Sequence, residues 1–376
     1  MDCEGTDMDN AMKYITNLLL LVTIVATGKY TSAQCLSAFQ DQRNFFFIVD
    51  DGNIIQQEHN LIYNYKAGRN HLAYLSFNND FKIYHNGLTQ TLQTFPPVNY
   101  YCTDYIMFVE NPGSQYYVLY GEKMDLINKG AGQVYGVGDS LVAFQDYMGQ
   151  FQLFKDGRVY EIDQREPYMV KVEDNMMVYL DRNNELRTFW QGDLITLEYG
   201  NPPQSVQVER NIAAYVDYIG NFKVFWAGDI YSVLNFQPGS YKAGQNLVAY
   251  IDNRKQFKIF YKGESFDIMS IEPKWYDVQQ NFVVWVDNNN YFNVFYEGKY
   301  ERLEGFVPAS YQISNNLLVY PNLDNYLFGY INGKKVKVSD EVTTWYEVQN
   351  DAVNYYKIKN FFKIYCDGNI TNAINR

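Results

Sequence analysis

The chain has 376 residues, of which 47% are hydrophobic and 18% aromatic, so it is long and apolar enough to bury a substantial core. Its 43 acidic and 31 basic residues give a formal net charge of −12 at pH 7, which disfavours nucleic acid and anionic membranes as partners. The 36 Tyr and 25 Phe are residue types that favour strands, and the composition therefore predicts an all-β protein.

The N-terminal segment has the pattern of a secretory signal peptide. Lys13 precedes an apolar run, Leu18 to Ala26, and small residues follow it. The run is too short to span a bilayer, which needs about 20 apolar residues, and no later segment is longer. We therefore expect an exported protein without a transmembrane segment, located in the periplasm, at the cell surface or outside the cell.

Two positions fit signal peptidase cleavage, because small residues precede both. Cleavage after Gly28 leaves a signal region over residues 1–28 and a mature chain over 29–376. Cleavage after Ala33 is the alternative, but it would remove the first strand of the first repeat. We favour the earlier cut.

A repeat of 35 residues, with one step of 36, runs along the chain. Its first marker is a recurrent Tyr, replaced twice by Val: Tyr30, Tyr65, Tyr100, Tyr135, Val170, Val206, Tyr241, Tyr276, Tyr311 and Tyr346. Its second marker is a Gly in the same phase: Gly52, Gly87, Gly121, Gly157, Gly192, Gly228, Gly263, Gly298, Gly333 and Gly368, of which Gly121 is one place early. Two residue types that share one register predict ten tandem units.

Each unit predicts four short antiparallel strands in a meander. In residues 239–273, the apolar stretches "NLVAYID" and "FKIFY" are separated by the polar turn "NRKQ", and "KGE" forms a tight turn before the fourth strand. The second and third strands are apolar on both faces, so neighbouring sheets must cover them. Radial stacking gives a β-propeller of about ten small four-stranded blades. An open solenoid and two five-bladed propellers are the alternatives; the 36-residue step between units five and six would suit the second.

One stretch resembles the TolB-like, WD-repeat-related propeller blade. It is "PKWYDVQQNFVVWVDNNNYFNVFYEG" over residues 273–298, and its matching positions are Pro273, Trp275, Asn281, Val283, Trp285, Asp287 and Phe295. The Ser-Pro-Asp-Gly turn of that family is absent here. The resemblance implies a propeller with the Tyr strand innermost, and it transfers no activity.

Two cysteines are placed to close the ring. Cys35 opens the second strand of the first unit, and Cys366 ends the third strand of the last. Antiparallel neighbours put both positions at the same end of adjacent blades, which predicts a Cys35–Cys366 disulfide in an oxidising compartment. The alternative is that both are unpaired and buried.

Candidate catalytic residues are few. His59, His71 and His85 have no metal-ligand spacing, and we predict no catalytic residue, metal or cofactor. Carboxylates in register end the second strands: Asp41, Asp146, Asp181, Asp217, Asp252 and Asp287. Such a ring could hold Ca²⁺ or supply an acid–base pair. Catalysis needs one asymmetric site whereas every blade needs the same turn, so we interpret these residues as Asx-turn caps.

A ligand site is expected on the face formed by the turns between second and third strands and by the Pro-containing crossovers. Trp275 and Trp345 stand there where other units have Ser, and indole faces stack on sugars or on protein side chains. The alternative is that both pack between blades. We therefore predict a monomeric, non-enzymatic propeller that binds a protein or carbohydrate at the bacterial cell envelope. A propeller enzyme that cleaves glycans or peptides with carboxylate chemistry is the second hypothesis.

Overall fold

The computed structural model describes residues 35–358 and 361–374, and within them every regular element is a strand. The predicted signal region, residues 1–28, and both predicted cleavage positions lie outside the described residues. No helix in the described part of the chain is long and apolar enough to cross a membrane.

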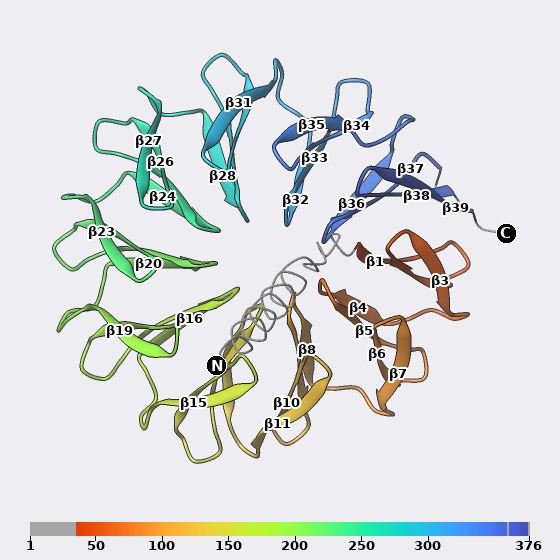
Figure 1. The fold of residues 1–376 in the computed structure, drawn as a ribbon, viewed down its shortest axis with the longest axis horizontal. Coiled ribbons are helices and arrows are strands. Elements are labelled where there is room, and N and C mark those ends of the chain that lie inside the picture. The colour runs from red at the N-terminus through yellow and green to blue at the C-terminus, as the bar shows by residue number, and fades with distance from the viewer. Residues whose placement is uncertain (1–34, 359–360, 375–376) are drawn as a thin grey trace, which may run out of the picture. The chain divides into compact units, whose positions relative to one another are not determined.

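The described strands form ten sheets, and strands adjacent in sequence are adjacent and antiparallel in each sheet. The sheets are arranged around a ring in chain order, with the first strand of each sheet pointing toward the centre (Figure 1). We number them blades 1 to 10. Blade 1 has three described strands, β1 to β3, and the residues before Cys35 lie outside the described part of the chain.

The strands fall into four classes by their place in the blade. The innermost strands are β4 (Asn64–Ala67), β8 (Asn99–Cys102), β12 (Gln133–Val137), β16 (Met169–Glu173), β20 (Ser205–Glu209), β24 (Ser240–Gly244), β28 (Trp275–Gln279), β32 (Gln312–Ser314) and β36 (Trp345–Gln349). The second strands are β1 (Leu36–Gln40), β5 (His71–Leu75), β9 (Ile106–Asn111), β13 (Leu141–Gln145), β17 (Met176–Leu180), β21 (Ile212–Val216), β25 (Leu247–Ile251), β29 (Phe282–Val286), β33 (Leu317–Pro321) and β37 (Ala352–Tyr356). The third strands are β2 (Phe46–Asp50), β6 (Phe81–His85), β10 (Gln115–Tyr120), β14 (Phe151–Lys155), β18 (Leu186–Trp190), β22 (Phe222–Trp226), β26 (Phe257–Tyr261), β30 (Phe292–Tyr296), β34 (Leu327–Ile331) and β38 (Phe361–Cys366). The outermost strands are β3 (Asn53–Glu58), β7 (Leu88–Gln93), β11 (Lys123–Lys129), β15 (Arg158–Asp163), β19 (Asp193–Glu198), β23 (Asp229–Leu234), β27 (Glu264–Met269), β31 (Lys299–Glu304), β35 (Lys334–Lys337) and β39 (Asn369–Ile374).

The recurrent Gly is explained by the turn between the third and fourth strands. In blade 7 this turn consists of Lys262 and Gly263, whose φ values are 49° and 87°, and Tyr261 pairs with Glu264 across it. Positive φ at both central residues is the requirement of a type I′ hairpin, which Gly meets without strain.

The core lies between the blades, as the apolar second and third strands predict. In β25, Val248 and Tyr250 are buried against blade 6, while the alternate residues Leu247 and Ala249 are buried against blade 8. Each blade therefore buries both of its faces by stacking on two neighbours, which is what a propeller requires.

The ring closes between blades 10 and 1, so the chain forms one ten-bladed propeller and not two five-bladed ones. Phe39 of β1 stacks on Phe362 of β38 with ring centroids 4.6 Å apart. The 36-residue step has a local cause: the crossover before β20 spans residues 199–204, whereas the crossover before β16 spans residues 164–168.

Candidate functional site

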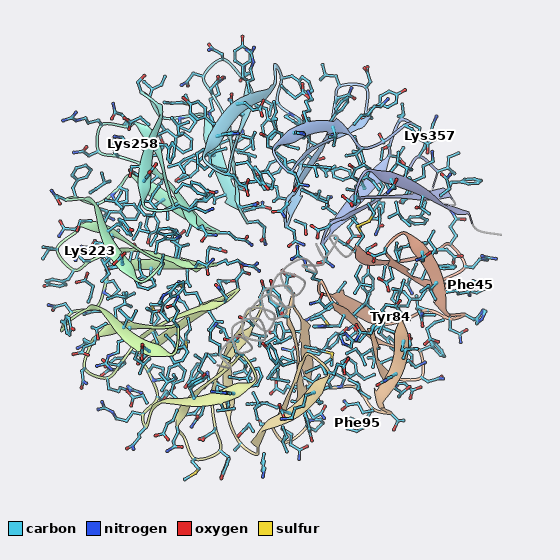
Figure 2. All side chains as sticks on the ribbon, viewed as in Figure 1. Phe45, Tyr84, Phe95, Lys223, Lys258 and Lys357 are labelled. Carbon is cyan, nitrogen blue, oxygen red and sulfur yellow. A yellow bond between two sulfur atoms is a disulfide. The ribbon has the colours of Figure 1, made fainter. Side chains whose placement is uncertain are left out.

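A groove lies between blades 2 and 3 near the rim of the ring. Two cavities of about 450 and 350 Å³ form it, and both are lined by Leu92 of β7 and Met124 of β11. Phe95, which lines the second cavity, is labelled at the rim in Figure 2. We call these two cavities the blade 2–3 groove.

At three other interfaces of the ring, an aromatic pair fills the corresponding space. Tyr160 of blade 4 packs on Phe189 of blade 5 with ring centroids 4.9 Å apart. Tyr231 of blade 6 packs on Phe260 of blade 7 at 5.3 Å. In these two pairs the fourth strand supplies the Tyr and the next blade's third strand supplies the Phe.

Blades 2 and 3 carry smaller side chains at both of these positions. Gln90 pairs with Ile83 in the register in which Tyr160 pairs with Leu153, so Gln90 takes the place of the Tyr. Leu119 of β10 takes the place of the Phe, and both Gln90 and Leu119 line the first cavity. At this interface, therefore, neither blade supplies the ring that fills the space between blades 4 and 5 or between blades 6 and 7.

The early Gly121 belongs to the same site. Tyr120 pairs with Lys123, so Gly121 and Glu122 are the two turn residues between β10 and β11. Gly121 has a φ of 61° and stands first, which is the order of a type II′ turn, whereas the other blades have Gly second. This reversal places Glu122 in the wall of the first cavity, where it is the one carboxylate among the described residues that line the groove.

Exposed apolar side chains surround the groove. Leu88 and Phe95, which line it, are 65% and 46% exposed. Leu126 is 41% exposed and pairs with Tyr117, so it lies on the face of blade 3 that borders the groove. Clustered exposed apolar side chains around a concave surface are typical of a protein interaction site.

A cluster of charged side chains, which we call the Arg210 cluster, lies where the first strands end near the centre of the ring. It consists of Arg210, Asp104, Asp139 and Asp174. Arg210 places its guanidinium 3.3 Å from an Asp104 carboxylate oxygen and 3.2 Å from one of Asp174, and it also pairs with Asp139. These four residues belong to four consecutive blades. Arg210 therefore ties together turns that are up to 106 residues apart.

Two carboxylates near Arg210, those of Glu209 and Asp174, have raised pKa values. Burial, with Glu173 adding to it, raises the pKa of Glu209 to about 7. Burial and the carboxylates of Glu209 and Asp104 raise the pKa of Asp174 in the same direction, while its ion pair with Arg210 favours the charged form. A group that titrates near neutral pH can act in proton transfer, but it also occurs in structural ion-pair networks.

The six turn acids lie at the 2–3 turns, where each caps its own turn. In Asp252, Oδ1 accepts hydrogen bonds from the backbone N–H groups of Arg254 and Gln256 at 2.8 and 2.9 Å. The same two contacts, to the N–H groups two and four residues later, are made by Asp41, Asp146, Asp181, Asp217 and Asp287. In blade 9, Asn322 makes both contacts without a carboxylate.

Metal-binding groups are absent from the residues that the structure describes: no three His, Cys, Asp or Glu side chains there are placed to hold an ion. His59 contacts Gln56 at 3.0 Å. His71 and His85 lie together, with ring centroids 6.2 Å apart. Burial lowers the pKa of His71 to about 4.

The two predicted ligand-binding tryptophans are half-buried. Trp275 lies parallel to Tyr311 of the next blade, with ring centroids 6.0 Å apart. Trp345 stacks on Tyr356 of its own blade at 5.0 Å and meets Phe362 edge-on. Packed rings therefore cover part of each indole, and their role in ligand binding stays a prediction.

The structure joins Cys35 and Cys366 in a disulfide, with Cα atoms 6.1 Å apart. The bond lies at the junction of blades 10 and 1, beside the stacked rings of Phe39 and Phe362. Cys102 is a free thiol in blade 3.

The groove and the Arg210 cluster were missed from the sequence, although both leave a trace there. Aligning the repeats places Gln90 in a variable column that also holds Ile55, Asp125, Tyr160, Ile195, Tyr231, Phe266, Glu301, Val336 and Thr371. The position of Arg210, in the turn after the first strand, is polar in blades 2 to 10. Its residues are Arg69, Asp104, Asp139, Asp174, Arg210, Gln245, Gln280, Asn315 and Asn350.

Three solved structures show distant similarity to this chain. The computationally designed Ika8 protein is 14% identical, with 73% of this chain and 94% of that chain covered and a TM-score of 0.33. Prp20p from Saccharomyces cerevisiae is 8% identical over 61% of this chain and 81% of its own, also at 0.33, and the tricorn protease is 10% identical over 92% and 45%, at 0.24. Scores of this size support no conclusion about this chain. No curated protein matches the sequence. The family model of the 10-bladed beta propeller domain matches residues 30–370, and the chain belongs to this family.

Proposed function

We propose that this protein is an exported, non-enzymatic β-propeller that binds a protein ligand at the bacterial cell envelope, and that the blade 2–3 groove is the binding site. The groove carries this proposal. Aromatic pairs fill this space at three other interfaces, whereas between blades 2 and 3 Gln90 and Leu119 leave it open and exposed apolar side chains lie around it.

Two features support export. The apolar run from Leu18 to Ala26 has the length and flanks of a signal peptide. The Cys35–Cys366 disulfide belongs to an oxidising compartment, because cytosolic thiols are kept reduced.

The walls of the groove favour a protein over a carbohydrate. Aliphatic side chains such as Leu88, Leu92 and Met124 line it, and these bind apolar side chains by excluding water. Sugars are recognised by flat aromatic faces together with several polar groups. The fold by itself, including its resemblance to TolB-like and WD-repeat-related blades, assigns no ligand.

Site-specific photo-crosslinking tests the proposal. A photoreactive amino acid replaces Leu88 at the groove or, as a control, Val159, which is 46% exposed on the outer strand of blade 4. In an envelope fraction from the source cells, we expect the Leu88 probe to give a defined protein adduct that the Val159 probe does not give. Equal labelling by both probes, or binding on a glycan array with no protein adduct, contradicts a protein-binding groove.

A carboxylate-dependent hydrolase acting on glycans or peptides is the second candidate, and the observation that favours it is the raised pKa of Glu209. Hydrolysis of an envelope polysaccharide or peptide that is abolished by Glu209→Gln would support it. Turnover that survives this substitution, or no turnover of either class, argues against it.

A further inference from the structure

We propose that β7 is a site of strand addition: an extended segment of a partner protein pairs with the free edge of blade 2 and places apolar side chains in the blade 2–3 groove. The segment alternates apolar with other residues and carries a basic residue that reaches Glu122. This inference rests on the proposed protein-binding function and names its mode and the chemistry of its ligand.

The free edge of β7 has backbone groups available for pairing. Asn86 and Gly87 form a two-residue turn with φ values of 50° and 78°, so His85 and Leu88 are joined by the turn's hydrogen bond. Antiparallel pairs alternate between bonded and non-bonded positions, which makes Gln90 the next residue bonded to β6. The N–H and C=O groups of Thr89 and Thr91 therefore point away from β6.

The edge of β7 also lacks the usual protection against pairing. Outer strands normally carry charged side chains that disfavour pairing with a strand of another molecule, as β11 and β15 do. The sequence of β7 is "LTQTLQ", which has no charged residue, and five of its six positions are exposed. The other uncharged outer strand, β39, lies in blade 10, whose junction with blade 1 holds the disulfide.

The groove lies beside this edge on one face of the blade. Leu88, Gln90 and Leu92 alternate along β7 and line the groove, so they point toward blade 3. A strand added to β7 would continue the same alternation. Every second side chain would then lie over Met124 and Leu126, the apolar residues that blade 3 presents there.

Charge selects a partner segment over a second copy of this chain. Glu122 is the carboxylate of the groove, and the whole chain carries a net charge of −12. Two copies joined edge to edge would bring like-charged molecules together and leave Glu122 without a cation. A segment with Lys or Arg near the β10–β11 turn pairs with Glu122 and is attracted by the net charge.

The test uses a yeast-displayed library of random linear peptides, selected against the folded protein. We expect enriched peptides to alternate apolar residues, to contain Lys or Arg and to lack Pro in their centre. Thr89→Pro removes an outward N–H without touching the ladder to β6, together with the hydrogen bond that the Thr89 hydroxyl donates to Gln57 at 2.6 Å. Gln90→Tyr fills the gap as Tyr160 does in blade 4. Each should weaken peptide binding at least about tenfold, a change of about 1.4 kcal/mol.

The matched control is Val159→Pro, which makes the same edge change after the same kind of turn, Asp156 and Gly157, where the neighbouring gap is filled. It should leave binding unchanged. Enriched peptides that ignore Thr89→Pro and Gln90→Tyr overturn strand addition at β7 but leave protein binding intact. If no peptide is enriched, strand addition is overturned, and the crosslinking experiment still decides the proposed function by itself. Self-association lost on Thr89→Pro would make a second copy the occupant and overturn the partner segment.

Discussion

The interface between blades 2 and 3 and the interface between blades 6 and 7 share one arrangement of strands and differ in the side chains that fill it. In the second, Tyr231 and Phe260 meet with ring centroids 5.3 Å apart and close the space between the sheets. In the first, Gln90 and Leu119 occupy the same positions and leave a cavity of about 450 Å³. The fourth strands of blades 2 and 6 pair with the third strands in the same register, whereas the β10–β11 turn of blade 3 has its Gly first and not second.

The substitution of two side chains between blades 2 and 3 shows how a repeat protein can acquire one asymmetric site. Ten copies of a blade give the same surface ten times, so a specific ligand site needs a local departure from the repeat. In this protein the departure is the smaller volume of the side chains at Gln90 and Leu119, and the backbone of the strands is unchanged. The reversed Gly121–Glu122 turn adds a charge to the same spot.

The junction of blades 10 and 1 extends the comparison, because it is closed by a covalent bond. Cys366→Ala should lower the free energy of unfolding by about 4 kcal/mol, since the bond joins residues 331 apart. Denaturant unfolding without reductant measures the loss. The matched control, Cys102→Ala, should cost about 1 kcal/mol, and an equal loss in both variants would contradict a ring-closing role.

Removing the aromatic pair between blades 6 and 7 should open a cavity there like the one between blades 2 and 3. The double variant Tyr231→Gln/Phe260→Leu removes one buried and one partly buried ring and should lower the free energy of unfolding by about 3 kcal/mol. Gln90→Ala, made at the open interface, should change it by less than about 0.5 kcal/mol because Gln90 is exposed. Equal costs for both variants would show that the two interfaces are packed alike.

The turn acids offer a comparison within every blade. Asp252→Ala leaves two backbone N–H groups without their acceptor and should cost about 2 kcal/mol. Asp252→Asn should stay within about 0.5 kcal/mol of the native protein, because Asn322 already makes both contacts in blade 9. A thermal midpoint that rises with added Ca²⁺, and no longer does so in Asp252→Asn, would instead support a metal site.

The Arg210 cluster should make stability depend on pH. The pKa of Glu209 is raised in the folded chain from 4.5 to about 7, so the unfolded chain releases this proton first and stability falls as pH rises between these values. Because Glu209 is partly exposed, the loss should be only about 1 kcal/mol. Glu209→Gln should remove it, so that the variant is more stable than the native protein at pH 8 but not at pH 4. Parallel pH profiles of the two proteins would disprove the assignment.

The fold could be predicted from the sequence because it rests on features that repeat. The recurrent Tyr and Gly marked ten units, and the apolar stretches such as "NLVAYID" required cover on both faces, which leads to a ring of blades. Averaging over ten copies makes such a signal strong even where a single unit departs from it.

The candidate site could not be predicted in the same way, because it consists of departures. Gln90 and Leu119 are ordinary residues singly, and they make a groove only when two different blades face each other. The Arg210 cluster depends on how narrow the ring is where the first strands end, since Arg210 and Asp104 lie three blades apart. The early Gly121 was visible as an irregularity, but its link to the groove needed the turn geometry.

The double variant Gln90→Tyr/Leu119→Phe is the strongest test of the blade 2–3 groove as the binding site, with stability and peptide binding measured on the same sample. The new aromatic pair should fill the groove, raise the free energy of unfolding by about 1 kcal/mol and abolish binding of the selected peptides. A less stable protein, or one that still binds these peptides, would contradict the view that the missing rings between blades 2 and 3 form the binding site.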